Sequence, residues 1–123
     1  MSYEFEVKTH YPMRIVFFIG NYKEFIDTLN DRYSLGLVEE DPGIYKAETR
    51  PLDEYGVVFV WMLKYKNTLE DRGYLVHELV HVISKVSQCI GMEMKEDTEE
   101  PLAYLLQHLY TEFHFELKNV KKR

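Results

Sequence analysis

Two apolar segments of the chain have the composition of β-strands. Residues 14–19, RIVFFI, are mostly β-branched or aromatic, which favours an extended conformation. Residues 57–63, VVFVWML, form an unbroken apolar run, typical of a strand that is buried on both faces near the centre of a sheet. Residues 22–33 instead carry apolar side chains at i, i+1 and i+4, which predicts a short amphipathic helix between the two strands.

A turn signal lies between this helix and the second strand. Asp41-Pro42-Gly43 suits a tight turn, because proline presets the first central position and glycine accepts a positive φ at the second. We therefore expect a hairpin here, with arms at residues 37–39 and 44–50.

After residue 67 the hydrophobic period changes, and the pattern predicts two long helices. The first covers about residues 69–90, with Thr68 as its N-cap and Gly91 as its C-terminal stop. The second follows a cap at Thr98 and extends to about Leu117. The expected core stripes are Leu75, Leu79, Val82, Ile83, Val86 and Ile90 on the first helix, and Leu102, Leu105, Leu109 and Phe113 on the second. His77 and His81 lie outside the first stripe.

These elements predict an α+β fold, a small antiparallel or mixed sheet packed against two main helices, in one domain over residues 1–123. The formal net charge of -6 argues against nucleic acid and anionic membranes as partners. No apolar run approaches the roughly 20 residues of a membrane-spanning helix. A single cysteine, Cys89, and a charged start without a signal-peptide pattern lead us to expect a cytoplasmic protein.

The candidate chemistry lies in His77-Glu78-Leu79-Val80-His81, an H-E-x-x-H motif inside the first long helix. Residues four apart share a helix face, so both imidazoles can reach one zinc ion while Glu78 is directed toward a bound water. A catalytic zinc needs a third protein ligand, and Glu100 at the start of the next helix is the candidate.

Other assignments of these residues stay open. Glu99 is an alternative third ligand, and Asp97 is a weaker one. Alternatively, both histidines are plain surface residues and Glu78 pairs with Lys85 or Arg72.

LVHELVH followed by EEPLAYLLQHL resembles the small single-domain zincin-like proteins, which combine H-E-x-x-H with a downstream glutamate and are often encoded by phages or prophages. The resemblance covers about residues 57–115. It implies a minimal, gluzincin-like metallopeptidase fold, host cytoplasm as the location if phage-encoded, and Glu100 as the third zinc ligand, because Ala103-Tyr104-Leu105 follows in phase.

A zinc peptidase also needs a donor for the oxyanion that forms during hydrolysis. Tyr104, His108 and His114 lie broadly on the Glu100 side of the second helix, and His10 is a weaker candidate. A peptide substrate would add as a strand along a sheet edge beside the motif helix.

The predicted function is therefore zinc-dependent peptide hydrolysis with Glu78 as general base. The alternatives are a non-catalytic metal-binding assembly or interaction protein, possibly phage-related, and a metal-free interaction domain. The 10 tyrosines hint at a protein partner.

Overall fold

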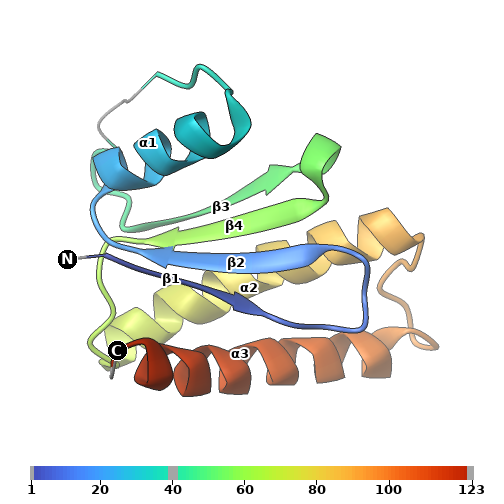
Figure 1. The fold of residues 1–123 in the computed structure, drawn as a ribbon. Helices are drawn as coiled ribbons and strands as arrows, with labels where there is room; N and C mark the ends of the chain where they lie inside the picture. The colour runs from blue at the N-terminus through green and yellow to red at the C-terminus, as the bar shows by residue number, and fades with distance from the viewer. Residues whose placement is uncertain (1, 39–41, 122–123) are drawn as a thin grey trace.

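The computed structural model describes residues 2–38 and 42–121. A four-stranded sheet and three α-helices make up an α+β fold, so the predicted fold class is confirmed (Figure 1). The elements in chain order are β1 (Tyr3–Val7), β2 (Arg14–Ile19), α1 (Tyr22–Tyr33), β3 (Ala47–Leu52), the 3-10 helix η1 (Asp53–Tyr55), β4 (Val57–Met62), α2 (Leu69–Ile90) and α3 (Glu99–Lys121).

The sheet is mixed and has the strand order β1-β2-β4-β3. The central pair, β2 and β4, is parallel, whereas β1 and β3 pair antiparallel with their inner neighbours. Every residue of β4 is buried, as the apolar run predicts for an inner strand covered on both faces. The two edges of the sheet are therefore β1 and β3.

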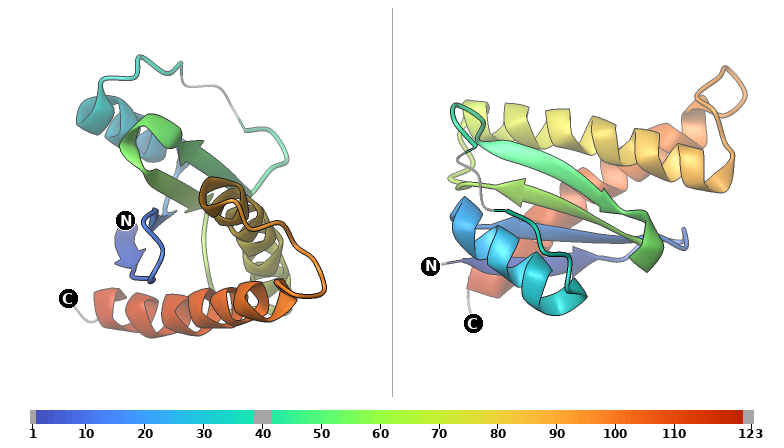
Figure 2. Two further views of the ribbon diagram at one scale, coloured as in Figure 1. Left: turned by 90° about the vertical axis from the view of Figure 1, so that its right-hand side faces the viewer. Right: turned by 90° about the horizontal axis from the view of Figure 1, so that it is seen from above.

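Helices cover both faces of the sheet (Figure 2). α1 packs on one face through Phe25, Ile26 and Leu29. α2 and α3 lie side by side on the other face, with α3 against β1 and α2 against β3. This arrangement places one face of α2 next to the β3 edge.

The two predicted core stripes are largely confirmed. All of the predicted stripe residues of α2 and α3 are buried except Ile90, which is half-buried. The Thr68 side chain caps α2 by accepting from the Asp71 N–H, and Gly91 ends the helix with a φ of 69°. α3 continues about one turn beyond its predicted end, to Lys121.

The predicted hairpin is wrong. Residues 37 and 38 are not in a strand, residues 39–41 lie outside the described part of the chain, and β3 begins only at Ala47 and pairs with β4. The reason is visible at Leu37, whose N–H donates to the Asn30 side chain at 2.7 Å and whose carbonyl accepts from it at 2.9 Å. The Asn30 side chain of α1 thus forms hydrogen bonds with the Leu37 N–H and carbonyl groups, which a neighbouring strand would otherwise pair with.

The strand β1 was not among the elements predicted from the sequence. Its signal is a short alternation in which Phe5 and Val7 are buried and Glu4 is exposed, the pattern of a strand with one covered face. In the described part of the chain, no helix has the length and apolar character needed to cross a membrane.

Candidate metal centre

The H-E-x-x-H residues lie in the middle of α2, on the side that faces β3. His77 and His81 are exposed, whereas Glu78 is only 6% exposed. Helix geometry explains this split, because residues four apart lie above one another and adjacent residues are turned by about 100°. The two imidazoles therefore stand at the surface, while the carboxylate between them lies under the edge of the sheet.

The two imidazoles have the spacing of a shared metal ion. Their Nε2 atoms are 3.3 Å apart, with ring centroids separated by 5.0 Å. Two nitrogens bound at about 2.0–2.1 Å to one tetrahedral zinc ion stand about 3.3 Å apart. His77 and His81 thus fit as two ligands of one ion.

Glu78 is held by a neighbour from the sheet. The Thr49 hydroxyl of β3 lies 2.8 Å from Glu78 Oε1 and 3.2 Å from the Glu78 carbonyl oxygen. The other carboxylate oxygen, Oε2, lies 3.9 Å from His77 Nε2. The carboxylate is therefore fixed by one hydroxyl and turned partly toward the imidazole pair.

The pairing of Glu78 with Lys85 or Arg72 is wrong. Lys85 Nζ donates to Asp53 at 2.9 Å, and this hydrogen bond raises the pKa of the Lys85 amine. Arg72 Nε donates to the Thr68 carbonyl oxygen at 3.4 Å. Both cations are thus engaged elsewhere.

A groove runs between α2 and β3 with the motif at its centre. It consists of two overlapping cavities of about 390 and 510 Å³ that share Tyr45, Ala47, His77 and Glu78. The first cavity continues over Thr49, Pro51, His81, Ser84, Lys85 and Gln88, and the second over Ile44, Lys46, Glu70, Gly73 and Tyr74. We call them the polar half and the apolar half of the groove.

The edge of β3 beside the groove can accept another strand. In the part of the chain that the structure describes, no strand pairs with its outer side. The Leu63 N–H donates to the Lys46 carbonyl at 2.9 Å, so by antiparallel alternation Ala47 and Thr49 turn their N–H and C=O groups outward. Pro51 follows on the same side and offers only a carbonyl, which ends the pairing window.

The structure does not bring the predicted third ligand to the histidines. Glu100 is exposed in the first turn of α3, as is the alternative Glu99. From His81 to its end at Ile90, α2 extends about 13 Å, and α3 then packs beside α2 toward β1 rather than β3. Within the described residues, no three His, Cys, Asp or Glu side chains gather as a potential metal site.

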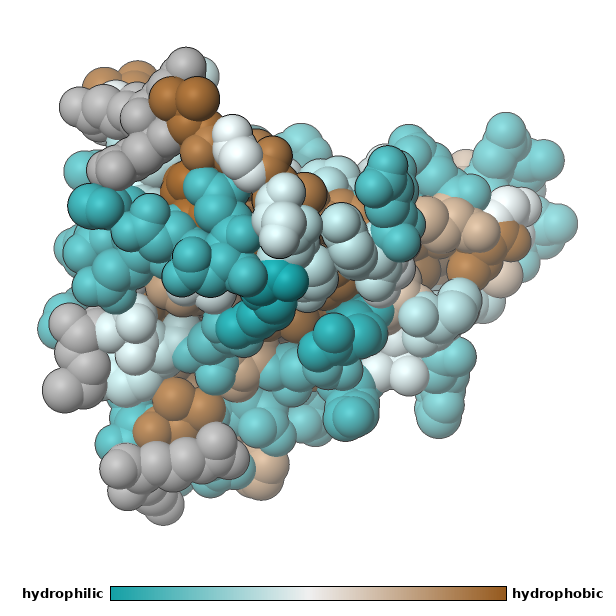
Figure 3. Space-filling view, turned by 45° about the horizontal axis from the view of Figure 1, so that its top comes forward, coloured by the Kyte–Doolittle hydropathy of each residue, from teal (hydrophilic) through white to brown (hydrophobic). Residues whose placement is uncertain are grey.

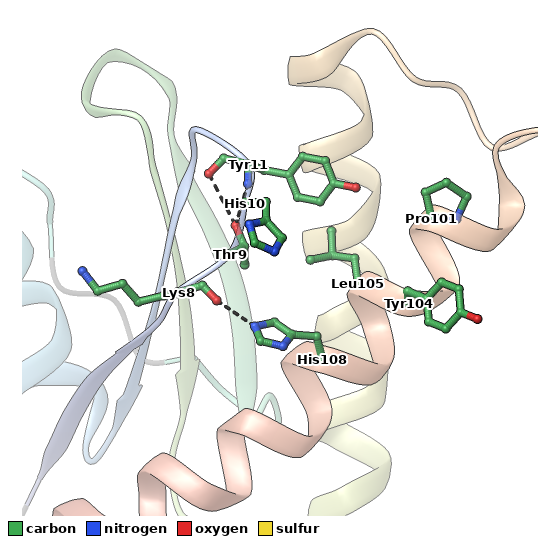
Figure 4. Close-up of a pocket in the computed structure, with 8 residues that line it drawn as sticks. All are labelled: Lys8, Thr9, His10, Tyr11, Pro101, Tyr104, Leu105 and His108. Atoms are coloured by element: carbon green, nitrogen blue, oxygen red, sulfur yellow. Dashed lines mark hydrogen bonds between the residues drawn. The ribbon is translucent and has the colours of Figure 1, made fainter.

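The predicted oxyanion donors also lie outside the groove. Tyr104, His108 and His10 line a separate cavity of about 450 Å³ between the β1–β2 loop and α3 (Figure 4). There His108 Nε2 donates to the Lys8 carbonyl at 2.7 Å. His114 lies further along α3, where its Nε2 is 2.6 Å from the Tyr65 hydroxyl.

Thr49 could not be identified from the sequence, because its contact with Glu78 depends on the order of strands in the sheet. Comparisons with protein-family models, curated proteins and solved structures find no match. The site combines two imidazoles at metal spacing, a buried carboxylate beside them, and the outer edge of β3, with which no strand of the described residues pairs.

Proposed function

We propose that this chain is a metal-dependent hydrolase of peptide bonds, in which His77 and His81 supply two ligands of the ion and Glu78 is the general base. The observation that carries the proposal is the Nε2 to Nε2 distance of 3.3 Å, which equals the spacing of two ligands of one tetrahedral ion. The buried carboxylate between the two imidazoles supports a catalytic rather than a purely structural centre, because a structural zinc has no use for a base.

The chain's own residues have separable tasks in this reaction. A bound zinc ion would polarise the scissile carbonyl and lower the pKa of water. Glu78 would take a proton from the attacking water and deliver it to the leaving amine. Thr49 would orient the Glu78 carboxylate through its hydroxyl, which leaves Oε2 free for the proton transfer.

An extended polypeptide is the substrate that the groove suits best. The outward N–H and C=O groups of Ala47 and Thr49 can pair with a substrate backbone, and Thr49 also contacts the general base. A strand held there would carry a peptide bond past His77 and Glu78. This mode of binding relies on backbone groups, so substrates of many different sequences could bind. Selectivity among them would come from pockets for their side chains.

A second candidate is a non-catalytic metal-binding assembly or interaction protein. It is favoured by the position of Glu100 on α3, away from the histidines, because the described residues then supply only two ligands. In that case a donor from a partner protein would complete the coordination of the ion.

Metal analysis of variants tests the proposal. We expect stoichiometric zinc in the wild type and in Glu78→Gln, and loss of zinc in His77→Ala and His81→Ala, with His108→Ala as the control histidine outside the groove. Hydrolysis of a denatured protein substrate should follow metal content except in Glu78→Gln, which keeps the metal and loses activity.

Each contrary result points to a different conclusion. A wild type that binds no zinc refutes the metal centre itself. Zinc binding without hydrolysis favours the interaction protein, and equal hydrolysis in Glu78→Gln removes the base from its assigned role.

A further inference from the structure

Gly73 lies in the interior of α2, one turn before His77, although nothing in the fold requires a glycine there. Its φ is not positive, and a Cβ added at this position would meet no atom within 4 Å. Glycine is among the least favourable residues in a helix interior. A residue that weakens the helix without relieving any close contact suggests a role for the space it leaves open.

That space is the apolar half of the groove. Gly73 lines it from α2, while Ile44 and Tyr45 line it from the segment that leads into β3. Ile44 is 87% exposed and Tyr45 is 71% exposed, so two large apolar side chains border an open cavity. On the face of the molecule that Figure 3 shows, most of the surface is hydrophilic and the hydrophobic side chains form separate patches.

The register of the β3 edge determines which part of a bound polypeptide faces this cavity. A residue of an added strand directly opposite Ala47 turns its side chain to the same side of the sheet as Ala47. Ala47 faces the α2 side, where it packs against the main core and lines the groove beside His77. The side chain opposite Ala47 is therefore directed toward Gly73, two residues from the side chain opposite Thr49 and Glu78.

We infer that the apolar half of the groove is a pocket for one large apolar or aromatic side chain of an extended polypeptide, and that Gly73 keeps the pocket open. The inference rests on the proposed function insofar as the polypeptide lies on the β3 edge. It adds the selectivity that backbone pairing alone lacks, since the pocket contacts the side chain two positions from the residue opposite Thr49 and Glu78.

Charge sharpens the expected selectivity. Glu70 lines the same half of the groove, one turn before Gly73 and Tyr74. Desolvation, and then the Glu70 carboxylate, raise the pKa of the Tyr74 phenol, so its hydroxyl stays neutral. Lys46 lines this half as well, so its ammonium group offsets the Glu70 carboxylate and the rim gives no net attraction to a charged side chain of either sign.

Peptide binding measured by fluorescence anisotropy tests the inference. The probes are labelled nonapeptides of Ser, Thr and Ala that carry Phe, Leu, Ala or Glu at the central position, and the protein is zinc-loaded Glu78→Gln, so that no peptide is cleaved. We expect the Phe and Leu peptides to bind about tenfold or more tightly than the Ala and Glu peptides, as burial of a large apolar side chain implies.

The Gly73 variants connect that preference to the pocket. Gly73→Leu in the same protein should abolish the preference for Phe, and Gly73→Ala should reduce it, while both raise the melting temperature because α2 gains a better helix former. Thr111→Leu adds the same side chain to an exposed position of α3 and is the matched control, so its preference should not change.

The inference is overturned if no peptide binds, if Phe and Glu peptides bind equally, or if Gly73→Leu keeps the preference. These outcomes are distinguishable from a failure of the proposed function, which is measured separately by zinc content and hydrolysis. A Phe preference without zinc binding refutes the metal centre and supports the pocket, whereas hydrolysis without any preference refutes the pocket alone.

Discussion

Replacing Thr49 with valine tests whether β3 holds the carboxylate of Glu78. The hydroxyl of Thr49 has one proton, and its shorter contact is the 2.8 Å hydrogen bond to Glu78 Oε1. Valine has the same branched shape and an equal preference for strands, so Thr49→Val removes the donor and leaves packing and backbone preference unchanged. Glu78 is only 6% exposed, so without the Thr49 hydroxyl its carboxylate has little access to water and no other side-chain donor within hydrogen-bond distance among the described residues.

The size of the effect follows from the charge of the acceptor. A hydrogen bond to a charged group contributes about 1.5–3 kcal/mol to the free energy of unfolding, compared with about 1 kcal/mol for a neutral pair. We therefore expect Thr49→Val to destabilise the protein by about 2 kcal/mol. In a domain of this size such a loss lowers the melting temperature by roughly 6–12 °C.

A double-mutant cycle with Glu78→Met shows where this stability resides. Thr49→Val should cost less than about 0.5 kcal/mol in the Glu78→Met background, because the acceptor is already absent. Thr49→Ser keeps the hydroxyl and is the control. Unfolding in urea gives the four free energies. If Thr49→Val has the same cost in both backgrounds, Thr49 does not act through Glu78 and the account of the site is refuted.

Two further predictions concern residues outside the groove. Burial first, and the neighbouring Tyr110 second, raise the pKa of Tyr65 to about 12, so the folded state retains the phenol proton that the unfolded chain releases near pH 10. The resulting stability is complete below pH 10 and is lost as the pH rises toward 12. Over this range we expect the free energy of unfolding, measured in urea, to fall by about 2–3 kcal/mol more in the wild type than in Tyr65→Phe. Parallel pH profiles of the two proteins would contradict this. Tyr104→Phe and His108→Ala should leave zinc content and hydrolysis unchanged, because both residues line the other cavity; a large fall in hydrolysis with intact folding would restore them to the site.

Features that depend on local pattern could be predicted from the sequence. The bounds of β2, α1 and α2 agree with the predicted ones, because periodicity, the Thr68 cap and Gly91 act within a few residues. The same helix phase correctly put His77 and His81 outside the core. It gave no indication that Glu78 is buried, since that depends on what lies over α2.

Features that depend on sheet order could not be predicted. The Asp41-Pro42-Gly43 signal suggested that the segment before it would pair with β3, but the Asn30 side chain occupies the backbone of Leu37 and β3 pairs with β4 instead. That choice makes β3 an edge strand and brings Thr49 to Glu78. For Glu100, spacing along the chain was compatible with the site, whereas the packing of α3 toward β1 decides its position.

The two acidic residues buried in the described structure, Asp71 and Glu78, separate structural from functional burial. Asp71 accepts a hydrogen bond from the Lys66 N–H and lies in the first turn of α2, where the helix dipole stabilises negative charge. Folding alone therefore explains why Asp71 is buried. Glu78 lies in mid-helix, where the dipole gives no such benefit, and depends on one hydroxyl. Burying a carboxylate there carries a desolvation cost that an apolar side chain would not have. A buried carboxylate that folding does not need, between two imidazoles at metal spacing, is therefore the strongest single reason to look for chemistry in this groove.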